Sequence, residues 1–200
     1  MRRGAPRSCL VAALLLGSAG AEAHLATTGL GPIYDGISHL FMSVDDLLPV
    51  LAMALLAGSN GPTSARWALF VLPTAWLAGG MAGFHGALTR VPASVPSFSL
   101  LLLGVLVAAD IRFRPPVVAA VAAILGVLHG GLNGADIAAA AREASSVVGI
   151  ASAVFVVSAL AAAAVVSLRV PWARVVVRVA GSWTAATGLL LLGWSLSGRG

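Results

Sequence analysis

The segment that decides the fold is SVVGIASAVFVVSALAAAAVVSL, residues 146–168, which contains no charged side chain. As an α-helix rising 1.5 Å per residue it would be about 34 Å long, enough to cross the roughly 30 Å hydrocarbon core of a bilayer. A helix also satisfies its backbone polar groups internally, as lipid requires. The segment therefore predicts a transmembrane helix.

Similar apolar runs extend this pattern in both directions along the chain. Turn-forming segments such as Asn60-Gly61-Pro62 and Arg114-Pro115-Pro116 separate them. Only 10% of the residues are charged, against about 25% in soluble domains, so the chain cannot cover a water-facing surface. The predicted fold class is an all-α, polytopic membrane helical bundle in the lipid bilayer, with six transmembrane helices at 43–59, 67–88, 95–111, 115–133, 146–168 and 175–196.

The N-terminus has the organisation of a cleavable signal peptide over residues 1–23. A basic start precedes a short apolar core, and Ala21-Glu22-Ala23 fits the small-x-small cleavage pattern. Cleavage after Ala23 would make His24 the first residue of a single six-helix transmembrane domain, residues 24–200. The alternative is an uncleaved first helix. Cleavage would also remove Cys9, the only cysteine, which excludes disulfides and cysteine-based metal sites from the mature chain.

The basic residues are distributed as topology signals. All 12 are arginines that lie singly or in pairs between apolar runs, so no nucleic-acid partner is predicted. With the mature N-terminus outside, six arginines fall on the cytoplasmic side and three on the outer side, in agreement with the positive-inside rule. The chain is thus predicted to be a multi-pass protein of the bacterial inner (cytoplasmic) membrane with a periplasmic N-terminus.

This topology gathers all four histidines and four of the acids at the outer face. An ionisable group costs roughly 2.5–3.5 kcal/mol at the centre of a membrane helix, so such groups tend to mark binding or conduction sites. Imidazole and carboxylate together suit divalent metals. The cluster comprises His24, Asp35, His39, Asp45, Asp46, His85, His129 and Asp136, and the predicted metal ligands are His24, His39, Asp45, Asp46, His85 and His129.

Each of these residues also has a structural interpretation. Asp45 and Asp46 lie where acids complement a helix dipole. A membrane histidine commonly bonds a neighbouring helix, and Asp136 fits a solvated loop acid equally well. Asp110, at the inner end of the third predicted helix, is either a charge-paired helix end beside two arginines or an exit site on the cytoplasmic side.

Helical spacing predicts how the cluster is arranged. If the chain is helical from His39 onward, one face carries His39, Met42, Asp46 and Met53. Small residues at four-residue steps predict close packing of helices 67–88 and 115–133, which would carry His85 and His129 into the bundle interior. These steps are Gly79 to Gly83, Ala82 to Gly86, and Gly126 to Gly130 to Gly134.

The segment HLFMSVDDLL, residues 39–48, resembles the first-helix signature of the HupE/UreJ family: histidine, five residues, aspartate, histidine, then a leucine-rich helix. His39 and Asp45 match it, while Asp46 replaces the second histidine and Leu40 replaces the usual proline. The His-Gly pairs at 85–86 and 129–130 are similar to family features. The resemblance implies a secondary permease for Ni²⁺ or Co²⁺, with the ion as substrate and not as a cofactor, and urease or hydrogenase maturation proteins as partners.

Asp46 gives this chain a harder oxygen ligand than the signature has, which moves metal preference toward Mn²⁺ or Mg²⁺. No Gly-x4-Gly-Lys-Ser/Thr motif occurs, so uptake is expected to be driven by the membrane potential or by protons. Catalysis is not predicted. Three alternatives remain open: a membrane metal-binding accessory or sensor protein without transport, an intramembrane metalloenzyme, and a helical scaffold whose polar residues only hold the bundle together.

Overall fold

The computed structural model describes residues 28–87, 91–92, 94–168 and 170–197, and over these ranges the chain forms seven helices and no strand. The all-α prediction is confirmed. The predicted signal peptide, residues 1–23, and the predicted ligand His24 lie outside the described residues.

Four helices of the described ranges are long and apolar enough to cross a membrane, which makes the chain a multi-pass membrane protein. A further pair, α2 and α3, passes the same test only together and is bent by 77°. α5 is a shorter apolar helix of 15 residues. The four long helices are α4 (Pro62–Phe84), α6 (Pro115–Ala139), α7 (Ser145–Ser167) and α8 (Pro171–Leu196), and the others are α2 (Pro32–Met42), α3 (Val44–Ser59) and α5 (Ser94–Ala108).

Prolines mark the starts of the helices better than the edges of the apolar runs do. α2, α4, α6 and α8 each have a proline in the first helical turn, where its missing N–H costs nothing, so α4 begins five residues before the predicted start. α6 continues to Ala139, six residues beyond the predicted end at Asn133, because Gly134 is packed against α4 and does not end the helix. α4 instead ends at Phe84, and Gly86 adopts a positive φ of 83° after it.

A single residue, Ser43, separates α2 from α3. Its N–H donates to the carbonyl of His39 at 2.9 Å, and its own carbonyl accepts from the N–H of Leu47 at 2.9 Å. Ser43 is therefore the C-cap of one helix and the N-cap of the next. The prediction of one helical face from His39 to Met53 is wrong, since the bend leaves Met42 exposed while Met53 is fully buried.

α4 and α6 pack in direct backbone contact. A Cβ on Gly83 would overlap the carbonyl oxygen of Gly131, and a Cβ on Gly134 would overlap that of Gly80. Only glycine fits at such a crossing, so the close packing predicted from the glycine steps is confirmed. This contact fixes the height of His129 relative to α4.

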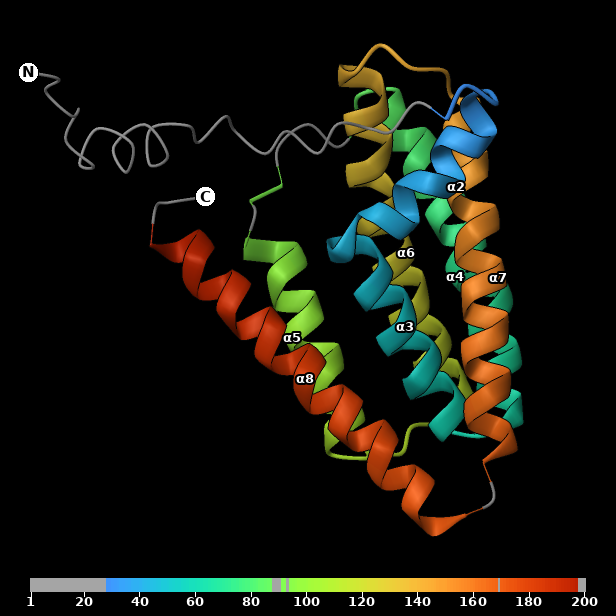
Figure 1. Cartoon of the computed structure of the whole chain (residues 1–200), viewed down its shortest axis with the longest axis vertical. Coiled ribbons are helices and arrows are strands. Elements are labelled where there is room, and N and C mark those ends of the chain that lie inside the picture. The colour runs from blue at the N-terminus through green and yellow to red at the C-terminus, as the bar shows by residue number, and fades with distance from the viewer. Residues whose placement is uncertain (1–27, 88–90, 93, 169, 198–200) are drawn as a thin grey trace, which may run out of the picture.

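The helices form a larger body and a separate pair (Figure 1). α2, α3, α4, α6 and α7 make up the body, whereas α5 and α8 pack on each other and diverge from it toward the upper end of the view. The core includes Leu40, Met53 and Trp76, all fully buried. The first turn of α3 lies beside α2, α6 and α5, with Asp46 buried and Val44 and Asp45 exposed.

Candidate functional site

Asp46, in the first turn of α3, is the centre of a buried polar cluster. Its side chain is about nine-tenths buried. One carboxylate oxygen, Oδ1, lies 3.3 Å from Nδ1 of His129, and the other, Oδ2, accepts a hydrogen bond of 2.9 Å from the Asn133 amide. Oδ2 also lies 3.7 Å from Nε2 of His39. A buried carboxylate is tolerated only with such partners, because its desolvation is otherwise uncompensated.

His129, on α6, is held at both ring nitrogens. Its Nε2 lies 3.0 Å from the hydroxyl of Ser99 on α5, and that hydroxyl donates its only proton to the carbonyl of Pro96 at 2.7 Å. The Ser99 hydroxyl thus holds the ring at Nε2, and on the other side Nδ1 faces Asp46 Oδ1 across 3.3 Å.

Asn133 and Trp76 fix the orientation of Asp46. The indole N–H of Trp76 donates to the side-chain oxygen of Asn133 at 3.2 Å, which turns the Asn133 amide nitrogen toward Asp46. The Trp76 ring also stacks on His129, with ring centroids 5.7 Å apart. Trp76 is fully buried, so it holds both α6 side chains in place from α4.

His39, on the last turn of α2, approaches the cluster from the other side of the bend. Its Nε2 lies 3.4 Å from the Ser43 hydroxyl as well as 3.7 Å from Asp46. The bend at Ser43 turns the end of α2 over the start of α3, so residues seven apart meet although they are not on one helix. The cluster thus joins five helices: α2, α3, α4, α5 and α6.

Two of the predicted ligands lie outside this cluster. Asp45 is exposed and lines a separate cavity of about 210 Å³ between α3, α5 and α8. His85 is exposed at the end of α4, where its ring makes an edge contact with Phe84 at 5.5 Å. The prediction that His85 lies in the bundle interior is wrong, because α4 ends one residue before it. For His129 the same prediction is confirmed.

The remaining acids have their own surroundings. Asp35 pairs with Arg142 at 3.5 Å and accepts two hydrogen bonds from Thr28, so it holds α2 to the segment before α7. Asp136 is exposed near the end of α6. Asp110 forms an ion pair of 2.9 Å with Arg112, which confirms its interpretation as a charge-paired helix end.

The cluster is close-packed and is not a preformed ligand cage. Within the described ranges, no group of three or more His, Cys, Asp or Glu side chains is arranged to hold a metal ion. His39, Asp46 and His129 are between 1% and 8% exposed, so the cluster is closed to water in this conformation.

Sequence reasoning missed Trp76 and Ser99 as parts of this site. Trp76 precedes Gly79 and Gly80 by one helical turn, so the glycine steps were the available signal that it faces α6. Asn133 follows His129 by four residues, so helical spacing puts both on one face of α6. Nothing in the sequence pairs Ser99 with His129, because they are 30 residues apart on different helices.

Two comparisons with known proteins found relatives of this chain. The model of the HupE / UreJ protein family matches residues 12–191. Among curated proteins, the chain is similar to protein HupE of Rhizobium leguminosarum bv. viciae, with 29% identity over 187 residues that cover 91% of this chain and 94% of the relative. No solved structure matches the chain. A multi-pass helical chain matched over nearly its whole length by this family model belongs to the HupE/UreJ family.

Proposed function

We propose that the protein is a secondary permease for a divalent transition-metal cation, nickel or cobalt, and that His39, Asp46 and His129 bind the cation. The observation that carries the proposal is the buried contact of 3.3 Å between His129 Nδ1 and Asp46 Oδ1. A bound metal ion would lie between this nitrogen and this oxygen.

The surroundings of His129 suit metal ligation. A metal-ligating imidazole usually donates its other N–H to a protein acceptor, which fixes the tautomer. Ser99 fills this role at Nε2 and leaves Nδ1 directed at Asp46. Binding of the cation would release a proton, so affinity is expected to rise with pH.

The spacing at Asp46 also suits an ion. Two ligands that each lie about 2.1 Å from a metal are separated by about 3.0 Å in octahedral and about 3.4 Å in tetrahedral geometry. The 3.3 Å between His129 Nδ1 and Asp46 Oδ1 falls in this interval, and the 3.7 Å between His39 Nε2 and the other oxygen, Asp46 Oδ2, lies just above it. Water would complete the coordination of an ion held by so few protein ligands.

The bend between α2 and α3 supports transport over simple retention. Broken helices form the substrate sites of many secondary transporters, where they allow one part of the bundle to move against another.

Ser99 belongs to α5, which packs on α8. A movement of the α5–α8 pair would therefore change the partner of His129 and expose the site.

We further propose the membrane arrangement. Six passes result if the α2–α3 pair counts as one span and the short α5 as another, with the cluster near the outer, periplasmic end after cleavage at Ala23. The arginine distribution supports this orientation in the inner membrane. Urease or hydrogenase maturation proteins are the proposed recipients of the metal.

Uptake into proteoliposomes tests the proposal. The full chain is expected to accumulate radioactive Ni²⁺ or Co²⁺, and His39→Ala and His129→Ala are expected to abolish uptake. His85→Ala is the matched control, since His85 is exposed and outside the cluster, and it is expected to retain uptake. Mn²⁺ is included because of the carboxylate at Asp46.

Binding measured by calorimetry on the same variants separates the alternatives. Stoichiometric metal binding without flux would instead indicate an accessory or sensor protein. No binding at all would leave a buried network that only stabilises the bundle, which its low exposure also allows.

A further inference from the structure

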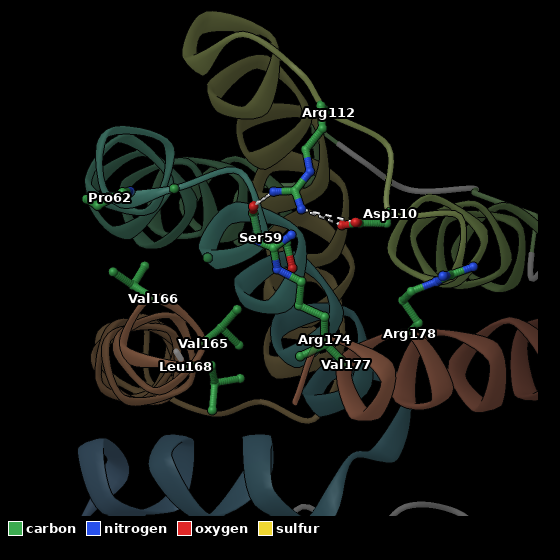
Figure 2. A pocket seen from close by; sticks show the side chains of 12 residues that line it. Ser59, Pro62, Asp110, Arg112, Val165, Val166, Leu168, Arg174, Val177 and Arg178 are labelled. Carbon is green, nitrogen blue, oxygen red and sulfur yellow. Dashed lines mark hydrogen bonds and ion pairs between the residues drawn. The ribbon is translucent and has the colours of Figure 1, made fainter. Parts of the chain in front are cut away.

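A second polar region lies at the opposite end of α3. The 16 residues of this helix rise about 24 Å, so its last residues are well separated from Asp46. A cavity of about 170 Å³ lies there, between the ends of α3 and α7, the segment around Arg112 and the first turns of α8 (Figure 2).

Arginines dominate this cavity. Arg112, Arg174 and Arg178 line it and Asp110 is the only acid among the lining residues, which leaves a net charge of +2. Arg112 and Arg174 extend toward Ser59 from opposite sides (Figure 2).

The three arginines differ in how far their hydrogen-bonding capacity is used. Arg112 is committed to Asp110 and to the carbonyl of Ser59. Among the residues that the structure describes, Arg178 donates only its Nε, to the carbonyl of Ala108 at 2.8 Å, which leaves both of its terminal nitrogens available to a ligand. Arg174 makes no hydrogen bond or ion pair with any residue that the structure describes. Two guanidinium groups thus retain donors for a ligand.

These charges exclude a metal cation and favour a phosphate. Guanidinium groups match phosphate oxygens in bidentate geometry and are strong charge-assisted donors. An exit site for the cation at Asp110 is therefore disfavoured, because the carboxylate is paired and the cavity around it is positive.

The apolar part of the lining indicates where the phosphate comes from. Val165, Val166 and Leu168 at the end of α7 and Val177 of α8 line the cavity, and Val166 and Leu168 are exposed. Trp172, in the first turn of α8, is 67% exposed, as expected for an aromatic residue at the membrane–water boundary. Basic pockets between helices at such a boundary suit anionic headgroups.

We propose that this cavity binds a phosphate group and that an anionic phospholipid supplies it. The phosphodiester lies between Arg174 and Arg178, and the acyl chains lie along the valines of α7 and α8. The site is independent of metal transport.

Native mass spectrometry of the purified full chain tests this proposal. Short-chain phosphatidylglycerol, short-chain phosphatidylcholine and inorganic phosphate are titrated separately and in competition. The variant is Arg174→Gln with Arg178→Gln, which removes two charges but keeps polar side chains. The matched control is Arg66→Gln with Arg114→Gln, which removes two exposed arginines that do not line the cavity.

Phosphatidylglycerol is expected to bind roughly tenfold more tightly than phosphatidylcholine, and the cavity variant to lose roughly tenfold in this affinity. The control is expected to stay within about twofold of the unmodified chain. Equal losses in both variants, or equal binding of the two lipids, would overturn the proposal. Displacement of the lipid by inorganic phosphate at equal concentration would overturn the lipid as its source. Arg174→Gln alone repeats the test if the double variant elutes as aggregate.

Discussion

The two ends of α3 carry opposite charges in opposite environments. At its start, Asp46 is buried next to His39 and forms hydrogen bonds with the side chains of His129 and Asn133. At its end, Arg112 binds the terminal carbonyl of Ser59 while about half of its own side chain remains exposed. Both ends complement the helix dipole. Only at the start does the loss of one group leave buried partners unsatisfied, so stability and function should be far more sensitive there.

The largest effect is expected for Asp46→Ala. This change leaves the Asn133 amide and one nitrogen of His129 without a partner, at a cost of about 1–3 kcal/mol for each buried group. Thermal unfolding in detergent should show a marked loss of stability, and metal uptake should vanish. Asp46→Asn restores a hydrogen-bonding side chain of the same size, so it should recover most of the stability but not the uptake. Unchanged melting of Asp46→Ala would mean that the two ends of α3 are equivalent.

A smaller effect at the same end is expected without altering any polar residue. Gly134→Ala places a methyl group against the backbone of α4, which should push α6 and its His129 away, at a cost of about 1–3 kcal/mol. The stability against unfolding and the affinity for metal should both decrease. Gly193→Ala is the control, since its Cβ would meet nothing within 4 Å and the change should be harmless. Equal behaviour of the two variants would argue against the close α4–α6 crossing.

Ser99→Ala should act more selectively. It removes the hydroxyl that contacts His129 Nε2, at a cost of about 1 kcal/mol, but leaves Asp46 and its other contacts in place. Because the His129 ring is then no longer held at Nε2, metal affinity should fall by roughly tenfold while folding is little changed. Calorimetric titration with Ni²⁺ measures this. An affinity equal to that of the unmodified chain would exclude Ser99 as a positioning residue.

The smallest effect is expected for Arg112→Gln. Its ion pair with Asp110 is partly exposed, and such pairs contribute about 0–1 kcal/mol. Stability should change by less than about 1 kcal/mol and uptake should persist. A loss as large as that of Asp46→Ala would show that the arginine end is also a structural centre.

The apolar runs were sufficient to predict the fold class and most of the helices, because hydrocarbon length and backbone satisfaction leave few alternatives. They did not reveal the break at Ser43, which contains neither proline nor glycine. They also could not distinguish Asp45 from Asp46, since about 100° of helical rotation decides which of two neighbours is buried. The predicted position of His85 depended on where α4 ends, and α4 ends at Phe84, one residue before it.

The 15 residues of α5 have a further consequence. They rise only about 22 Å, roughly 8 Å less than the hydrocarbon core of an average bilayer. Phe98, Leu102 and Val105 of this helix are exposed, so lipid would contact it directly in the proposed six-pass arrangement. The bilayer is expected to thin locally beside α5 to relieve this mismatch. A thinner hydrocarbon core beside Ser99 would shorten the path that a charged substrate has to travel through a medium of low dielectric constant.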